Sequence, residues 1–279
     1  MSRTLLIGDI HGGYKALLQC LERSNFNYKE DTLIQLGDIV DGWSEVYECV
    51  EELLKIKNLI AIRGNHDDWF RQWLINGQHP ISWNQGGYGT LNSYCKHLDK
   101  ELWGADKQGY LTTLLDIDLP QSHIQFFLNK QQPYYIDSNN RLFVHGGFNR
   151  HFSITDQIHN SEDILMWDRD LWLAAMSYGT INKNDDEPRP NFRIYDNFKE
   201  IFIGHTTTMN WSEPIELYDN GIPKITKLSI DYPMNKANIW NLDTGCGYNG
   251  KLTIMDVDSK EYWQSDNVKQ LYINEKGRN

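Results

Sequence analysis

The sequence predicts an α/β fold, because short apolar segments alternate with amphipathic ones in the first part of the chain. Thr4–Ile7, Thr32–Leu36 and Leu59–Ile62 are apolar runs with the length of buried strands. Between them, apolar residues recur at the spacing of one helix face in Tyr14–Leu21 and Val46–Leu54. Strands that alternate with helices form βαβ units, so we expect a parallel sheet at the core.

The following residues predict helices and a hairpin. We expect Asp67–Pro133 to be mainly helical. Asn139-Asn140 is a turn signal, and it predicts a hairpin between the apolar runs Tyr134–Asp137 and Arg141–Val144. We expect a single helix over Ser161–Tyr178, with Ser161 as its N-cap before two acidic residues.

The last part of the chain returns to strands. Ile201–Ile203 and Ile239–Leu242 are expected strands, and Leu252–Val257 with Glu261–Gln264 forms an expected final hairpin. The polar, Pro-containing segment Asn182–Pro190 has the composition of a mobile loop. We find no internal repeat and no break in composition, so a single domain over residues 1–279 is expected.

Composition excludes several classes of protein. Lys and Arg number 27 against 38 Asp and Glu, and a net charge of −11 argues against a broad face for duplex nucleic acid. The four cysteines are far apart and form no CxxC pair, which is typical of reduced thiols in a cytosolic protein. The apolar run near Met1 is too short for a signal peptide, and no run reaches the roughly 20 residues that span a bilayer. We therefore expect a cytoplasmic protein that binds no membrane.

Potential metal ligands follow the expected strands. The first three strands end at Gly8-Asp9-Ile10-His11-Gly12, Gly37-Asp38-Ile39-Val40-Asp41 and Gly64-Asn65-His66-Asp67, and two later ones at His145-Gly146-Gly147 and Gly204-His205. In open α/β sheets, ligands bind at the carboxyl ends of the strands. Each segment alone is a weak signal, but five in this order indicate one site.

Together these segments resemble the phosphoprotein phosphatase branch of the calcineurin-like metallophosphoesterases, whose pattern is GDxHG, GDxVDRG, GNH(E/D), HGG or HAG, and GH. The resemblance extends from Gly8 to His205, and Leu242–Thr253 is similar to the closing segment of bacterial members. It implies a four-layer α/β/β/α fold, in which a β-sandwich is flanked by helices. Asp67 in place of Glu is similar to Ser/Thr protein phosphatases of the bacterial and bacteriophage type.

The resemblance also implies a site for two divalent metal ions that share a carboxylate. It places Asp9 and His11 on the first ion, Asp38 as the bridge, and Asn65, His145 and His205 on the second. Oxygen and imidazole ligands of this kind suit Mn, Fe or Zn. A water acidified by the two ions is then the expected nucleophile.

Further residues acquire catalytic and phosphate-binding roles by the same resemblance. His66 matches the general acid, and Asp41 matches the carboxylate that orients it and raises its pKa. Asn65, His66 and Arg169 are the expected phosphate-binding residues, and Arg63 is expected to support its loop. Four alternatives stay open: His66 as a surface loop residue, Asp41 as a helix cap, Arg169 in a surface salt bridge, and Arg63 in direct contact with the phosphate.

The match fails after Asp41, where Gly42-Trp43 replaces the Arg-Gly of GDxVDRG. The missing arginine normally grips the substrate phosphate. Either another basic residue substitutes for it, or affinity for phosphomonoesters is weaker, or the substrate differs. We expect Gly42→Arg to lower KM for a small aryl phosphate, and an unchanged KM means that the gap is already filled.

Three functions follow from the sequence. The first is a metal-dependent phosphomonoesterase of the Ser/Thr protein phosphatase type, acting on a phosphorylated protein or peptide. The second is a symmetric dinucleoside-polyphosphate hydrolase, with Trp43 as a surface on which a base stacks. The third is a phosphate-sensing scaffold that binds metal with weak catalysis, and only the missing arginine supports it.

Overall fold

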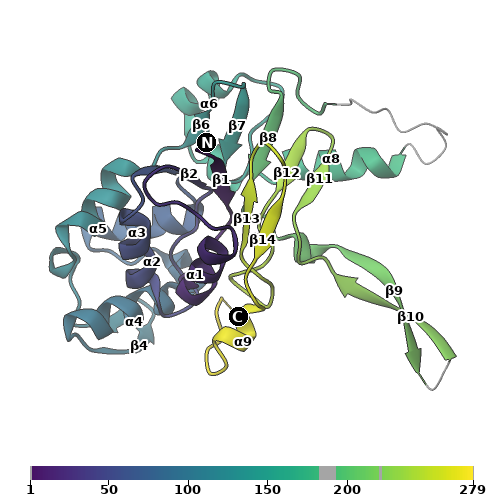
Figure 1. Cartoon of the computed structure of the whole chain (residues 1–279). Coiled ribbons are helices and arrows are strands. Elements are labelled where there is room, and N and C mark those ends of the chain that lie inside the picture. The colour runs from purple at the N-terminus through teal and green to yellow at the C-terminus, as the bar shows by residue number, and fades with distance from the viewer. Residues whose placement is uncertain (1, 182–192, 220–221, 279) are drawn as a thin grey trace.

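Two five-stranded sheets form the centre of the computed structural model, which describes residues 2–181, 193–219 and 222–278 (Figure 1). The first sheet has the strand order β14-β13-β1-β2-β3. Its strands are β1 (Thr4–Ile7), β2 (Thr32–Gln35), β3 (Asn58–Ala61), β13 (Thr253–Asp256) and β14 (Tyr262–Gln264). β1, β2 and β3 are parallel as expected, whereas β13 and β14 join in antiparallel pairing, so the sheet is mixed.

The second sheet has the order β11-β12-β8-β7-β6. Its strands are β6 (Tyr134–Ile136), β7 (Arg141–Val144), β8 (Glu200–Ile203), β11 (Met234–Lys236) and β12 (Ile239–Asn241). The three inner strands are parallel, and the two edge strands are antiparallel to their neighbours. The carboxyl ends of β7 and β8 therefore lie at one edge of this sheet.

The alternation of side chains along each strand explains how the two sheets pack. In β1, Leu5 and Ile7 pack against helices, whereas Leu6 packs against the second sheet. In the second sheet, Phe143 and Phe202 point toward the first, and their rings stack with centroids 5.0 Å apart. Because both faces of each inner strand are buried, these strands are apolar at nearly every position.

Helices cover the outer faces of both sheets (Figure 1). The first sheet is covered by α1 (Tyr14–Arg23), α2 (Val46–Leu54), α3 (Asn65–Asn76), α4 (Gly87–Leu98) and α5 (Gln121–Gln125). The second is covered by α6 (Ile154–Ser161) and α8 (Asp170–Ile181). The predicted four-layer α/β/β/α arrangement is therefore confirmed.

The structure contains two hairpins that the sequence did not predict. β4 (Leu102–Asp106) and β5 (Gly109–Thr112) lie within the segment expected to be mainly helical. β4 is largely exposed, so it lacks the alternating apolar face that marks a strand in a sequence. β9 (Ser212–Asp219) and β10 (Ile222–Ser229) form the second hairpin, which extends away from the two sheets in Figure 1.

The single helix expected over Ser161–Tyr178 is wrong. The segment divides into the end of α6, the short α7 (Ile164–Trp167) and α8, and Ser153 rather than Ser161 is an N-cap. The break follows from the close passage of the loop after β7: Gly146 N–H donates to Leu165 O, and a Cβ on Gly147 would lie 2.5 Å from Asp168 Oδ1. Asp168 has extended backbone there and accepts from Leu171 N–H, which starts α8.

Short elements complete the described chain: the 3₁₀ turns η1 (Ile81–Asn84), η2 (Asp116–Asp118) and η4 (Thr208–Asn210), the π-helical turn η3 (Phe126–Lys130), and α9 (Val268–Leu271). The segment Asn182–Pro190, expected to be a mobile loop, lies outside the described residues. The four cysteines are buried and unpaired with one another, as expected. Over the described ranges, every helix is too short or too polar to cross a bilayer.

Candidate metal centre and active site

The six predicted metal ligands come together where parallel strands of both sheets end. Asp9 and His11 follow β1, Asp38 follows β2, and Asn65 follows β3 at the start of α3. The second sheet contributes His145 after β7 and His205 after β8. All six side chains are buried.

Two overlapping groups of ligand atoms form within this cluster. One atom each from Asp9, His11 and Asp38 lie within 4.8 Å of one another, and the same holds for Asp38, His145 and His205. Asp38 belongs to both groups, which is the position that a bridging carboxylate requires. Asn65 adjoins the second group, because its Oδ1 lies 3.1 Å from His145 Nε2.

The histidines present the nitrogen that a metal ion needs. Nδ1 of His11 lies 2.8 Å from Asp41 O, and Nδ1 of His145 lies 2.8 Å from Leu36 O. Because carbonyl oxygens only accept, both Nδ1 atoms donate, and Nε2 is the nitrogen of each ring that is left to bind a metal ion. Nε2 of His205 is buried and has no hydrogen-bond partner within the described residues. Buried lone pairs beside carboxylates fit divalent metal ions.

The charges of the cluster support the same conclusion. Burial acts against a charged imidazole, yet the Asp38 and Asp9 carboxylates raise the pKa of His145 to about 9. Burial also opposes the ionised form of Asp38, but His145 and His66 hold its pKa well below its ordinary value. Without a metal ion, a proton on His145 therefore balances the shared carboxylate. A bound cation can take over that balancing charge.

The cluster is built on strained backbone. Four of the nine described non-glycine residues with positive φ belong to the site: His11 at 49°, Asp38 at 56°, Asp41 at 66° and His205 at 63°. Each costs roughly 1–2 kcal/mol relative to ordinary backbone. These backbone conformations direct the side chains inward from the strand ends. The packing of both sheets stabilises the strained backbone.

Two glycines allow the carboxylates to approach the backbone closely. A Cβ on Gly64 would lie 2.1 Å from Asp38 Oδ1, and a Cβ on Gly204 would lie 2.1 Å from Asp9 Oδ1. Backbone donors then fix the carboxylates: His66 N–H donates to Asp38 Oδ1 at 2.9 Å, and His205 N–H donates to Asp9 Oδ2 at 3.1 Å. Gly64, which precedes Asn65, and Gly204, which precedes His205, are thus needed for this close approach.

Asp67 is a site-building residue to which the sequence analysis gave no structural role. Its carboxylate accepts from the backbone N–H groups of Asp38 and Ile39, both at 2.9 Å, and from Gln131 Nε2 at 2.8 Å. It also accepts from Gly64 N–H at the start of α3, three residues earlier. This bond is the half of a capping box that the N3 carboxylate supplies; Gly64 has no side chain for the other half, so the sequence shows no capping-box motif here.

His66 and Asp41 form the predicted pair. His66 Nδ1 lies 2.8 Å from Asp41 Oδ2, while Asp41 Oδ1 accepts from Thr90 Oγ1 at 2.6 Å and from Trp83 Nε1 at 2.9 Å. His66 is buried at the edge of a cavity, which excludes the alternative of a surface loop residue. Asp41 caps no helix, since Glu45 occupies the N-cap position of α2.

The expectation that Asp41 raises the pKa of His66 is wrong for the metal-free chain. Burial lowers the pKa of His66 to about 3, and it raises the pKa of Asp41 to about 8. Desolvation outweighs the attraction between the two side chains. At neutral pH the free pair is therefore uncharged, with a protonated Asp41 beside a neutral imidazole.

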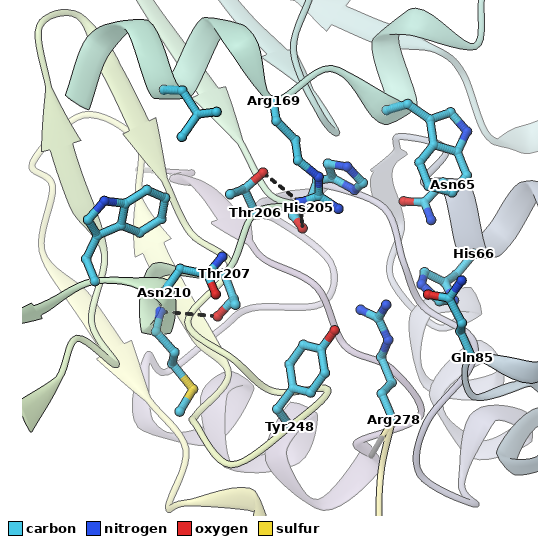
Figure 2. Close-up of a pocket in the computed structure, with 14 residues that line it drawn as sticks. Asn65, His66, Gln85, Arg169, His205, Thr206, Thr207, Asn210, Tyr248 and Arg278 are labelled. Atoms are coloured by element: carbon cyan, nitrogen blue, oxygen red, sulfur yellow. Dashed lines mark hydrogen bonds between the residues drawn. The ribbon is translucent and has the colours of Figure 1, made fainter. Parts of the chain in front are cut away.

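A cavity of about 740 Å³ opens beside the cluster (Figure 2). Asn65, His66 and His205 line its inner end. Its remaining lining comes from several segments: Gln85, Trp167, Arg169, Leu173, Thr206, Thr207, Met209, Asn210, Trp211, Tyr248 and Arg278. In Figure 2, Arg169 and Arg278 extend toward the cavity from opposite sides.

The structure places the remaining candidate residues as follows. Arg169 Nη1 donates to Thr206 Oγ1 at 3.0 Å and forms no surface salt bridge with a described residue. Arg63 pairs with Glu162 away from the cavity, in agreement with a supporting role. Trp43 is fully buried and stacks on Tyr272, so the expectation that a base stacks on it is wrong.

Comparisons with known proteins bear directly on this site. The model of the calcineurin-like phosphoesterase family matches residues 2–209, a stretch that contains all six predicted ligands. The chain belongs to the calcineurin-like phosphoesterase family. Its members depend on two metal ions, and the chain is therefore a metallophosphoesterase enzyme.

Relatives of this phosphoesterase carry more than one name. One relative is a symmetrical bis(5'-nucleosyl)-tetraphosphatase of Wigglesworthia glossinidia brevipalpis. The two sequences are 24% identical over an alignment that covers 93% of this chain and 97% of the relative. Another relative is serine/threonine-protein phosphatase 1 of Salmonella typhimurium. Here the identity is 31%, but the alignment covers only 26% of this chain and 37% of the relative. A metallophosphoesterase of Sphaerobacter thermophilus has the same fold, with a TM-score of 0.50 and 18% identity over 95% of this chain and 89% of that one. The family is confirmed, whereas the protein phosphatase branch is not.

Proposed function

We propose that this metallophosphoesterase hydrolyses a symmetric dinucleoside polyphosphate between its inner phosphates. The observation that supports the proposal is the cavity beside the ligand cluster. Its volume is about 740 Å³, and two guanidinium groups and several aromatic side chains line it. Similarity over nearly the whole length to a symmetrical bis(5'-nucleosyl)-tetraphosphatase supports the same substrate class.

The proposed metal site uses the predicted ligands. Asp9, His11 and Asp38 would hold one ion, and Asp38, Asn65, His145 and His205 the other. When bound, two such ions activate a water molecule and neutralise charge on the phosphoryl group that it attacks. The backbone donors to Asp9 and Asp38 keep both carboxylates oriented before any substrate arrives.

His66 would protonate the leaving oxygen. Its Nδ1 is bonded to Asp41 Oδ2, so Nε2 is the nitrogen free to act on a substrate. The hydrogen bond between Asp41 Oδ2 and His66 Nδ1 contains one proton, and it orients the imidazole ring. A proton on Nε2 would be transferred to the leaving oxygen, while the proton of the Asp41–His66 hydrogen bond would reside on Nδ1, so the imidazole ends neutral.

The outer lining of the cavity would bind the rest of the substrate. Arg169 is bonded to Thr206 at the cavity wall, and its guanidinium suits the oxygens of a phosphate chain. Trp167 is exposed, and Trp211 and Tyr248 line the same cavity, so they replace Trp43 as candidate surfaces for a base. A phosphate chain with an aromatic group at each end matches this lining better than a phosphate alone.

A product assay tests the proposal. With Mn²⁺ present, diadenosine tetraphosphate should yield ADP as the main product. No cleavage, or cleavage to AMP and ATP, would reject it. Phosphopeptides and an aryl phosphate in the same panel provide the comparison by kcat/KM.

A protein phosphatase is the second candidate, and the local similarity to serine/threonine-protein phosphatase 1 favours it. A higher kcat/KM for a phosphopeptide than for the dinucleotide would establish this reading. The scaffold hypothesis rested on the missing arginine alone, and it predicts metal binding with no turnover on any member of the panel.

A further inference from the structure

The place where the sequence departs from its family pattern is occupied by a distant segment. Trp43 and Ser44 contact the segment 272–278, and the space that a side chain at position 42 would enter is bounded by Arg278. A Cβ on Gly42 would lie 3.4 Å from Arg278 Cγ, Trp43 stacks on Tyr272 with centroids 4.9 Å apart, and Ser44 Oγ donates to Glu275 Oε1 at 2.9 Å. These consecutive contacts bring Arg278 to the cavity.

Gly42 is suited to this arrangement and not to a side chain. Its φ is +126°, and a Cβ there would lie 2.9 Å from His11 O. A longer side chain that left the backbone in this direction would meet Arg278. Our expectation for Gly42→Arg is therefore reversed: the gap is filled, and the substitution should raise KM or destabilise the loop.

The side chain of Arg278 is guided into the cavity by its neighbours. Its backbone N–H donates to Gly247 O at 2.9 Å, and a Cβ on Gly247 would lie 2.8 Å from Arg278 Cδ. The guanidinium carbon lies 4.9 Å from the centre of the Tyr248 ring. Trp43 Nε1 donates to Cys246 O at 2.7 Å, which ties the same loop to residue 43.

Among the described residues, the guanidinium is left without an anionic partner. Its Nε is buried and has no hydrogen-bond partner in the described part of the chain, where the guanidinium also forms no salt bridge with a carboxylate. Nη1 lies 3.2 Å from His11 Nε2, the lone pair that a metal ion would use. If His11 Nε2 were to bind a metal ion, Arg278 Nη1 would lose this acceptor and would be available to a phosphate oxygen of the substrate.

We propose that Arg278 binds a phosphate oxygen of the substrate, and that it replaces the arginine absent at position 42. This inference rests on the proposed phosphoesterase site, and it names a binding residue of that site. Arg278 and Arg169 then hold the phosphate chain from opposite sides of the cavity (Figure 2). Gly42 provides the space, and Trp43 and Ser44 hold the segment that delivers the side chain.

The test uses the full chain loaded with Mn²⁺ and the variants Arg278→Ala, Arg278→Lys and Arg23→Ala. Isothermal titration calorimetry measures the Kd of inorganic phosphate, and kinetics measure KM and kcat for the best substrate. Loss of a charge-assisted contact predicts a Kd and a KM about 10- to 100-fold higher for Arg278→Ala, with a smaller rise for Arg278→Lys. Arg23 pairs with Asp266 on the surface, and its variant should match the wild type.

Rescue separates binding from a structural role. Guanidinium ion at millimolar concentration should restore part of the phosphate affinity of Arg278→Ala, because the space between Gly42 and Gly247 becomes open. Bound Mn²⁺ per chain should stay unchanged in this variant. Should Arg278→Ala fail to fold, Arg278→Met keeps the aliphatic contacts with Gly247 and carries the same test.

The outcomes distinguish this inference from the proposed function. Equal phosphate affinity and equal KM in the wild type and in Arg278→Ala overturn the role of Arg278, even if diadenosine tetraphosphate is cleaved. Weaker phosphate binding in Arg278→Ala, in a chain that does not cleave the dinucleotide, supports Arg278 and rejects the proposed substrate.

Discussion

The ligand cluster and the outer wall of the cavity are held by different kinds of contact. In the cluster, buried side chains at strand ends receive backbone hydrogen bonds, as in Asp9 and Asp38. On the wall, Arg169 is bonded to the Thr206 side chain, and Arg278 rests over the Tyr248 ring. The cluster is fixed by the sheets, whereas the wall is assembled from separate segments.

This difference suggests a division of labour. Ligands fixed by strand ends cannot move without disturbing both sheets, so the chemistry is tied to the fold. A wall of single side chains can change without that cost, as the exchange of an arginine at position 42 for Arg278 illustrates. We therefore expect changes in the cluster to affect turnover and changes in the wall to affect substrate affinity.

Asp38→Asn should have the largest effect, and it tests whether changes in the cluster affect turnover. Asp38 belongs to both ligand groups, so the amide should weaken both metal positions and lower kcat by more than about a thousandfold. Elemental analysis should find fewer than two Mn²⁺ per chain. Asp31→Asn, a buried aspartate outside the site, is the matched control. Near wild-type turnover in Asp38→Asn would refute the role of the cluster.

His66→Asn should separate proton transfer from metal binding. We expect kcat to fall about 100- to 10,000-fold, because the proton donor is lost, while metal content stays at the wild-type value. The loss should be smaller for an aryl phosphate with an acidic leaving group than for a phosphoserine peptide. Equal losses for both substrates would mean that His66 does not protonate the leaving oxygen.

Arg169→Ala tests the wall on the side opposite Arg278. KM should rise about tenfold with a smaller change in kcat, because the guanidinium is expected to bind the phosphate chain. Arg150→Ala, an exposed arginine outside this cavity, should leave both constants unchanged. A fall in kcat at constant KM would place Arg169 with the chemistry rather than with binding.

We expect the smallest effect at the amino-terminal ends of β1 and β2, away from the ligand cluster. Arg3 precedes β1 and pairs with Asp31 before β2 at 2.8 Å. Burial opposes ionisation of Asp31, but the donors from Arg3 and Asn27 hold its pKa below its ordinary value. A lowered pKa in the folded state means that this stabilisation is present above pH 3.8 and is lost as pH falls through the folded pKa.

Asp31→Asn should therefore reduce the free energy of unfolding at pH 7 by about 1 kcal/mol, and the difference from the wild type should shrink toward pH 3. Urea unfolding at the two pH values measures this change. Turnover at pH 7 should not change, since the pair is remote from the ligands. A constant difference across the pH range would contradict the assigned pKa direction.

The sequence predicted the cluster because each ligand adjoins a glycine at the end of an apolar strand. In Gly64-Asn65 and Gly204-His205, the strand end, the glycine that lets a carboxylate approach the backbone, and the ligand are all within a few residues. A local sequence pattern therefore predicts the geometry. The apolar strands predicted a parallel sheet core, and the four layers were predicted by the family resemblance. The single domain over residues 1–279, the cytoplasmic location and the identity of the metals stay predictions.

The wall could not be predicted in the same way. Arg278 faces the site only because Trp43 and Ser44 hold its segment, and no local pattern records those contacts. Trp43 was a candidate for stacking a substrate base, but it stacks on Tyr272, which is distant in sequence. The break before α8 depends on Gly147 passing beside Asp168, again a contact between separate segments.

Anomalous X-ray diffraction from crystals grown with Mn²⁺ tests the central claim most directly. We predict two peaks, one beside Asp9 and His11 and one beside His145 and His205, with the Asp38 carboxylate bound to both ions. A single ion, or two ions of which Asp38 binds only one, would contradict the shared centre on which the proposed chemistry depends.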